Sequence, residues 1–254
     1  MRRLVRVFFG WSFAAALTGC SSDDDGSGEK KPRPPTTSAE SLGEPHAGQY
    51  HLGPVDFAES EWHNACAPGG GYQASLREAT GLGGEYLAGV ANEHSQGSAV
   101  CDSCILIKTA TGRSIVARVV TYGVEQDPND IDVSPNVYEA INTGEYPRSM
   151  TWEFAKCPDT GPLSYEFKGG SNPYWTSVWV RNPRVPVTTA EVMSANHASF
   201  SGLRRETDGS LTDDSGYGSG EFTYRITAMD GQVVTETLAS FSAGIVVSGA
   251  QQFE

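Results

Sequence analysis

The sequence predicts an all-β protein. Glycine is abundant, at 29 of the 254 residues, and long amphipathic helical periodicity is scarce. The apolar runs are short, rich in β-branched residues and separated by turn residues, which is typical of strands. Such runs include ILIKTA, SIVARVVTY, TSVWVRN, EFTYRITAM and QVVTETL. No internal repeat is visible, and the chain beyond its N-terminal region is long enough for two small domains or one large one.

The N-terminus predicts export. Three arginines precede an apolar run at residues 7–17, which is too short to span a membrane and has the form of a secretory signal segment. The run ends in LTGC, which resembles the bacterial lipobox, and the following serines resemble outer-membrane sorting residues. We therefore predict a lipoprotein signal peptide at 1–19 and lipidation of Cys20, with the protein at the outer membrane or cell surface. The alternative is an ordinary signal peptide with an incidental cysteine.

Composition predicts a tether after the lipid and argues against one class of partner. Residues 20–45 are mostly Ser, Asp, Gly, Lys, Pro and Glu, so we expect a flexible segment. Loss of residues 1–19 removes three of the 18 basic side chains and none of the 31 acidic ones, which leaves a net charge near −16. Nucleic acid is therefore not an expected partner, and membrane contact is expected only through the lipid.

Four further cysteines indicate two disulfides. In an exported chain, Cys66, Cys101, Cys104 and Cys157 are expected to pair, and the sequence allows three pairings. The Cys-x-x-Cys at 101–104 is also compatible with redox chemistry or half of a zinc site. No second such motif or histidine pair completes a tetrahedral set, so we predict neither a metal nor a cofactor.

One helix interrupts the strands. In SPNVYEAI, Ser134 is a suitable cap, Pro135 suits the first turn, and apolar residues recur on one face. Asp132 lies just ahead of it. The stiff, turn-rich connector at 157–162 then predicts a boundary between a domain at 46–158 and a second at 162–254.

The order of these motifs resembles the expansins. EWHNACAP is followed by AVCDSCILI, SIVARVV, IDVSPNVYEAI, MTWEFAKC and then YWTSVWVRN with FTYRITAMDGQVV. The resemblance runs from about Gly48 to the C-terminus. It implies a six-stranded double-psi β-barrel, related to the endoglucanases of glycoside hydrolase family 45, followed by an immunoglobulin-like β-sandwich similar to a family 63 carbohydrate-binding module.

The resemblance also implies a function. Expansins bind cellulose and loosen plant cell walls without detectable hydrolysis, so the implied partner is cellulose or another β-glucan of the plant wall, contacted by a monomer. The family's barrel disulfides imply the pairs Cys66–Cys101 and Cys104–Cys157.

Asp132 matches the general acid of the related hydrolases. An inverting glycosidase needs a second carboxylate about 6.5–9.5 Å away to activate water. The barrel pattern offers no convincing one, because the first strand reads GQYHLG and the family's usual Thr falls on Tyr50 or His51. We therefore expect no hydrolysis, and expect Asp132 to hydrogen-bond the glucan and weaken contacts between chains. The alternative role of Asp132 is a structural acceptor ahead of the helix.

The chain departs from the family at the end of one strand. Expansins usually carry Asp there, in Thr-Asp-x-Tyr, whereas this chain reads VVTY, in which Tyr122 matches the aromatic residue. Glu125, Asp127 or Asp130 are candidate replacements, but the loop EQDPNDI is more simply a solvated turn, and calcium binding is a lesser alternative. Wall loosening is therefore less firmly predicted than cellulose binding.

The run NPYWTSVWVRN predicts a sugar-binding surface. Tyr174 and Trp175 correspond to two adjacent aromatics that the family presents to the polysaccharide, where flat rings stack on sugar faces. The family's third aromatic has no counterpart in LRRETDGSLTDD. Trp175 and Trp179 share a strand face about 13 Å apart, so Trp179 is a candidate replacement, with burial in the core or domain interface as the alternative. Tyr217, on the Gly-rich stretch DSGYGSGE, is a further candidate.

Two other functions fit parts of the sequence. An outer-membrane lipoprotein with such a barrel also resembles the peptidoglycan lytic transglycosylase family of rare lipoprotein A, but this chain ends in the aromatic-bearing sandwich rather than a peptidoglycan-binding repeat. A purely adhesive protein with an inert barrel is the other alternative.

Overall fold

The computed structural model describes residues 39–53, 65–66, 86–123 and 127–254. The signal peptide, Cys20 and most of the predicted tether lie outside these residues. The described residues belong to one compact unit, which contains a barrel and two further sheets. None of the helices in the described ranges is long and apolar enough to cross a membrane.

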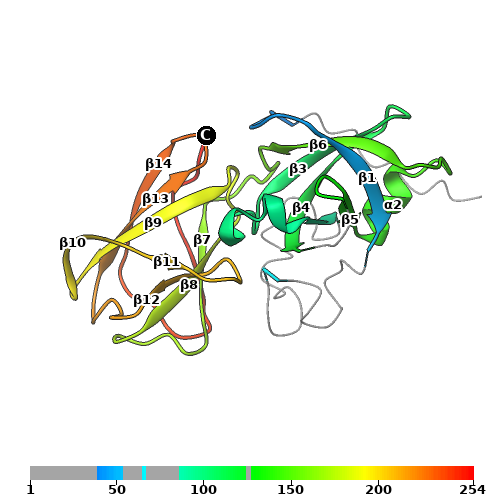
Figure 1. Ribbon diagram of the computed structural model, residues 1–254. Helices are drawn as coiled ribbons and strands as arrows, with labels where there is room; N and C mark the ends of the chain where they lie inside the picture. Colours follow the sequence, from blue (N-terminus) through cyan, green and yellow to red (C-terminus); the bar gives the residue numbers. More distant parts are fainter. Residues whose placement is uncertain (1–38, 54–64, 67–85, 124–126) are drawn as a thin grey trace, which may run out of the picture. The chain divides into compact units, whose positions relative to one another are not determined.

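The first part is a closed barrel with the strand order β1-β5-β2-β4-β3-β6, which confirms the predicted six-stranded barrel (Figure 1). β1 pairs in parallel with β5, as β2 does with β4, and the other neighbours are antiparallel. Inward-facing side chains such as Tyr50 and Trp152 are fully buried and fill the interior. The strands are β1 (His46–Leu52), β2 (Leu87–Val90), β3 (Cys104–Thr109), β4 (Ser114–Tyr122), β5 (Ile131–Val133) and β6 (Ser149–Ala155).

Short helical segments connect the barrel strands. The helix α2 (Pro135–Ile141) follows β5, and its buried Val137 and Ile141 lie one turn apart on one face. Ser134 is the residue before the helix but does not cap it through its side chain. Its hydroxyl instead accepts a hydrogen bond from the Leu87 backbone N–H at 3.2 Å, which corrects the predicted cap. Two 3₁₀ turns lie between β2 and β3, η2 (Asn92–His94) and η3 (Gln96–Ser98).

The second part consists of two antiparallel sheets, with the orders β10-β9-β13-β14 and β11-β12-β8-β7-β15. β13 alternates between buried and half-buried residues, as a strand with one covered face should. Tyr165, Phe167, Phe222 and Tyr224 pack between the sheets. The strands are β7 (Ser164–Phe167), β8 (Thr176–Arg181), β9 (Val187–Ser194), β10 (His197–Gly202), β11 (Arg204–Arg205), β12 (Leu211–Asp213), β13 (Phe222–Ala228), β14 (Val233–Leu238) and β15 (Val246–Ser248).

Two disulfides join distant parts of the barrel segment. Cys66 is bonded to Cys101, and Cys104 is bonded to Cys157, which confirms the pairing that the family resemblance implies. Two disulfides are typical of an exported protein.

The predicted tether is shorter than expected. Leu42 donates its backbone N–H to Phe154 O at 2.7 Å, and Ser41 forms a bridge with Ala155 at the end of β6. Residues 40–42 therefore extend the barrel rather than the tether. The reason is that Leu42 packs against the hydrophobic core, which compensates for the entropy of ordering the segment.

Candidate functional site

The turn that precedes β8 carries an exposed aromatic pair. The backbones of Asn172 and Trp175 exchange two hydrogen bonds, of 2.7 and 3.2 Å, and the Asn172 side chain accepts one from the Tyr174 N–H at 2.9 Å. Tyr174 is 81% exposed, and Trp175 is half-buried. The turn thus presents one full aromatic ring and part of a second to solvent on a hydrogen-bonded backbone.

The Gly-rich loop lies directly against this turn. At Gly216, which has φ +65°, a Cβ would lie only 2.5 Å from the backbone of Pro173 and of Trp175. Gly218 donates its N–H to Pro173 O at 2.9 Å. Only glycine permits such close backbone contact with positive φ, so the loop holds the turn in place.

Trp179 does not belong to this surface, which corrects its predicted role. Only 9% of the residue is exposed, and its indole N–H donates to Asp208 O at 3.0 Å. Two cations contact the ring, with Lys168 Nζ at 5.0 Å and Arg181 Cζ at 4.9 Å from its centroid. β8 is buried along its whole length, because it is a central strand with both faces covered. The alternative prediction, burial, describes this residue.

Tyr217 is also buried, at 1% exposure, and cannot stack on a sugar. Its ring packs against Phe222 with centroids 5.0 Å apart, and its hydroxyl accepts a hydrogen bond from Tyr224 at 3.1 Å. Tyr217 therefore anchors the Gly-rich loop to the core of the sandwich.

In the barrel, Asp132 lies opposite His51. The two residues are Cα partners in the parallel pairing of β1 with β5. A Cβ at Gly53 would lie 2.6 Å from Asp132 Cγ, so glycine is required for this carboxyl group to pack against the end of β1. Burial raises the pKa of Asp132, nearby His51 opposes this shift, and the charge of Asp130 adds to it.

Asp130 is fixed by its neighbours. One carboxylate oxygen accepts the Gln49 backbone N–H at 2.7 Å, and the other lies 2.9 Å from His51 Nε2. The residue is 4% exposed. Of the candidate replacements for the missing family aspartate, Asp130 is thus the one that the structure places beside His51, whereas Glu125 lies outside the described residues. Tyr50 is fully buried in the barrel and donates its hydroxyl to Glu145 at 2.7 Å, so His51 is the β1 residue that faces Asp132.

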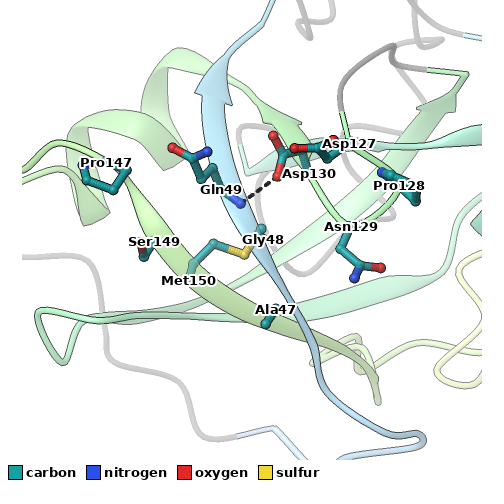
Figure 2. A pocket seen from close by; sticks show the side chains of 10 residues that line it. All are labelled: Ala47, Gly48, Gln49, Asp127, Pro128, Asn129, Asp130, Pro147, Ser149 and Met150. Carbon is teal, nitrogen blue, oxygen red and sulfur yellow. Dashed lines mark hydrogen bonds between the residues drawn. The ribbon is translucent and has the colours of Figure 1, made fainter.

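A hollow of about 500 Å³ adjoins Asp130. Figure 2 shows β1 crossing it, with the residues 127–130 on one side and the start of β6 on the other. Its lining residues are Ala47, Gly48, Gln49, Asp127, Pro128, Asn129, Asp130, Pro147, Ser149 and Met150.

Tyr122 is occupied by a contact with the sandwich. Its hydroxyl donates a hydrogen bond to the backbone oxygen of Thr207, in the hairpin between β11 and β12. Burial raises the pKa of Tyr122, and the charge of Asp208 raises it further. The structure therefore brings His51 and Asp132 together, but it places the Tyr122 hydroxyl against the hairpin.

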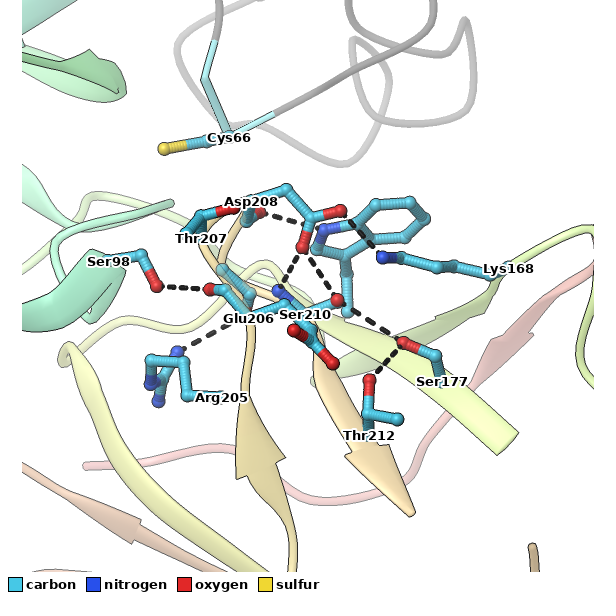
Figure 3. Close-up of polar contacts among 12 residues, drawn as sticks. Cys66, Ser98, Lys168, Ser177, Arg205, Glu206, Thr207, Asp208, Ser210 and Thr212 are labelled. Carbon is cyan, nitrogen blue, oxygen red and sulfur yellow. Dashed lines mark hydrogen bonds and ion pairs between the residues drawn. The ribbon is translucent and has the colours of Figure 1, made fainter. Parts of the chain in front are cut away.

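This hairpin joins barrel and sandwich in a way that sequence reasoning missed. Ser98 donates to Glu206 O at 2.5 Å, while Asp208 pairs with Lys168 at 2.7 Å and accepts two hydrogen bonds from Ser210 (Figure 3). The only sequence signal was the dipeptide Asp-Gly of a turn.

A buried ion cluster adds to this contact. Arg181, on β8, pairs with Glu166 at 2.9 Å and with Asp102, which lies inside the Cys-x-x-Cys motif. All three side chains are less than one-tenth exposed. The motif therefore positions an anchor for the sandwich. The sequence signal of this contact is the single charged residue of β8, because a buried charge requires a partner.

The fold and these contacts define a two-part β protein, in which a closed barrel is joined to a β-sandwich that displays an aromatic turn. No family model matches the chain. It is 22% identical over 209 residues to expansin-like protein 5 of Dictyostelium discoideum, covering 78% of this chain and 85% of that one. It is 28% identical over 140 residues to expansin-YoaJ of Bacillus subtilis, which covers 48% of this chain and only 54% of the relative.

Solved structures agree with this similarity. The fold matches the free expansin of Clavibacter michiganensis with a TM-score of 0.66 at 15% identity, covering 83% of this chain and 98% of that one. An aspartate-to-asparagine variant of that expansin, in complex with cellohexaose, matches with a TM-score of 0.65 at 16% identity and equal coverage. The predicted resemblance is thus confirmed: the chain is similar in sequence to expansins and shares the fold of the Clavibacter expansin.

Proposed function

We propose that this expansin-like protein binds cellulose, or a related neutral β-glucan of the plant wall, and loosens contacts between glucan chains without cleaving them. The observation that carries the proposal is the turn with Tyr174, 81% exposed, and half-buried Trp175. Flat rings at the surface stack on the C–H faces of sugars, and the hydrogen-bonded turn lowers the entropic cost of binding. The cellohexaose complex of the Clavibacter expansin supports a cello-oligosaccharide as the ligand class.

In the barrel, Asp132 contacts the glucan. Burial raises the pKa of Asp132, and its carboxyl group hydrogen-bonds a hydroxyl group of the glucan. Competition of this kind weakens hydrogen bonds between neighbouring chains. His51, opposite Asp132, is positioned to contact the same chain.

Hydrolysis is not part of the proposal. Both oxygens of the neighbouring carboxylate, Asp130, are engaged by Gln49 and His51, so it is poorly placed to activate a water molecule. If Asp130 does not act as the base, an acid at Asp132 completes with it only half of an inverting mechanism.

Adsorption to microcrystalline cellulose tests the binding site. Trp175→Ala and Tyr174→Ala are each expected to weaken adsorption about two- to twelvefold, which corresponds to about 0.5–1.5 kcal/mol per stacked ring. The matched control is Tyr146→Ala, because this barrel tyrosine is 86% exposed and belongs to no proposed site. Unchanged adsorption of both turn variants, with the fold intact by circular dichroism, would refute the proposal.

Reducing-sugar release tests the absence of hydrolysis. Incubation with soluble and insoluble β-glucans should release none above the buffer control. Release by the purified protein that disappears in Asp132→Asn would identify a glycosidase instead.

Display of the protein by a lipid at Cys20 is part of the same proposal, and metabolic labelling with a fatty acid, compared with Cys20→Ser, checks it.

A further inference from the structure

A second hollow lies beside the aromatic turn. It measures about 320 Å³ and is formed by residues 171–173 of the turn, 218–220 of the Gly-rich loop and 240–243 after β14. Its lining residues are Ser171, Asn172, Pro173, Gly218, Ser219, Gly220, Ser240, Phe241, Ser242 and Ala243. None of these ten is charged, although the chain carries a net charge of −13. The hollow beside Asp130, by contrast, is lined by two aspartates. The uncharged lining of the hollow beside the aromatic turn therefore suits a neutral ligand.

The lining offers hydroxyl groups and an apolar wall. Within the described part of the chain, the hydroxyls of Ser219, Ser240 and Ser242 have no hydrogen-bond partner, and all three residues are exposed. Pro173 and the half-buried Phe241 supply apolar surface, and the Phe241 ring is fixed by stacking on Phe167 at 4.8 Å. A pyranose ring presents hydroxyls at its rim and C–H groups on its faces, so this combination matches a sugar.

The hollow is built onto the aromatic turn. Gly218, on its wall, donates its N–H to Pro173 O, and Gly216 packs against the backbone of Trp175. The buried Tyr217 between these glycines fixes the loop to the core. A ligand stacked on the turn therefore lies next to a preformed hollow, so the turn and the hollow can contact the same ligand molecule.

We infer that this hollow binds a single neutral sugar that branches from a β-glucan backbone lying on Tyr174 and Trp175. A volume of about 320 Å³ is at the small end of ligand pockets, about 300–1,000 Å³, and suits one sugar ring rather than a chain. A flat cellulose chain stacks on the turn without entering the hollow. The inference rests on the proposed function, since the turn must hold the backbone, and it specifies the substrate class as a branched glucan.

Two soluble sugars with the same backbone test the inference. The probes are cellotetraose and a cellotetraose that carries xylose branches, and affinity is measured by isothermal titration calorimetry. The branched sugar is expected to bind about tenfold more tightly, as two additional hydrogen bonds would provide.

Variants of the hollow identify the contact. Ser219→Phe fills the hollow and should reduce the affinity for the branched sugar to that for cellotetraose, while cellotetraose binding stays unchanged. Ser215→Phe is the control, because Ser215 is exposed, lies on the same loop and does not line the hollow. The double variant Ser240→Ala with Ser242→Ala keeps the volume and should lose several-fold in affinity for the branched sugar alone.

The outcomes separate this inference from the proposed function. Trp175→Ala should weaken binding of both sugars, and unchanged binding would refute the proposal that the aromatic turn holds the glucan backbone. Equal affinity of the unaltered protein for the two sugars, or an unchanged preference of Ser219→Phe for the branched sugar, overturns the inference but not the proposed binding to the aromatic turn. Loss of cellotetraose binding in Ser219→Phe would show that the hollow takes the end of a linear chain and would also overturn the branch assignment. Binding of neither sugar would overturn both.

Discussion

Gly209 offers a direct test of the contact between the barrel and the sandwich. It lies in the hairpin between β11 and β12 with φ +81°, and a Cβ there would be 2.7 Å from Cys101 Cβ and 2.9 Å from Cys101 Sγ. Cys101 cannot move away freely, because it is bonded to Cys66. We expect Gly209→Ala to push the hairpin away from the barrel and to disturb the hydrogen bond from Tyr122 to Thr207.

The chain supplies a matched control at Gly231. Both glycines follow an aspartate in a turn, both have positive φ, at +81° and +88°, and both donate their N–H to the residue three positions earlier, at 3.0 and 3.1 Å. At Gly231, however, a Cβ would meet nothing within 4 Å. Gly231→Ala therefore measures the backbone strain alone, and the difference between the two variants measures the contact with Cys101.

The strain of an L-residue in this conformation is about 1–2 kcal/mol, which lowers Tm by about 2–8 °C in a chain of this size. Overpacking against Cys101 should add about 1–3 kcal/mol, or about 2–12 °C, in Gly209→Ala. Thermal unfolding followed by circular dichroism gives both values, and exchange of the Trp179 indole N–H, read by NMR, reports on the hairpin itself. Equal Tm values with unchanged exchange would show that the hairpin does not press on the barrel, and would refute the reasoning.

Three further predictions concern charge. Arg181→Met should lower the free energy of unfolding by about 3–5 kcal/mol, because it removes the cation that pairs with buried Glu166 and Asp102. Arg204→Met, at an exposed ion pair, should change it little. Similar urea midpoints for the two variants would contradict this prediction. Burial and nearby His94 lower the pKa of His46 below 6.5, so the unfolded chain binds the proton more readily than the folded chain. The free energy of unfolding should therefore fall as the pH drops through 6.5 towards the folded-state pKa. In His46→Asn this part of the pH dependence should be lost. The chain carries a net charge of −13 and pectin is also acidic, so adsorption to pectin-rich wall material should rise as NaCl screens the repulsion, while adsorption to bare cellulose stays constant. A steep fall of wall adsorption with salt would refute the argument from net charge.

Patterns with local causes could be predicted from the sequence. The β-branched runs became strands, and the family resemblance implied both disulfides, whereas the register that sets His51 opposite Asp132 is known only from the structure. The exposed position of Tyr174 also follows from its place in a turn, where Asn172 supplies the side-chain hydrogen bond that turns favour.

Burial of a strand's second face could not be predicted in the same way. Alternation predicts that Trp175 and Trp179 share a face, but it does not predict what covers that face. The covering group at Trp179 is Asp208, 29 positions along the chain, and this contact depends on tertiary packing. For the same reason the Gly-rich sequence around Tyr217 suggested an exposed loop, although glycines that pack against backbone produce an equally Gly-rich pattern.

The hairpin contacts residues of both parts of the site. The segment that would supply a third aromatic reads Glu-Thr-Asp-Gly-Ser here, and its backbone oxygens accept hydrogen bonds from the Tyr122 hydroxyl and the Trp179 indole. These contacts require a short, tightly turned backbone, because the hairpin must fit against Cys101. They do not require an aromatic side chain that points outward. The segment thus holds the barrel tyrosine and the sandwich tryptophan in place of binding sugar itself. Under the proposed function, stacking is then left to the turn with Tyr174 and Trp175, and the neutral hollow beside that turn adds a contact only for a glucan that carries a branch.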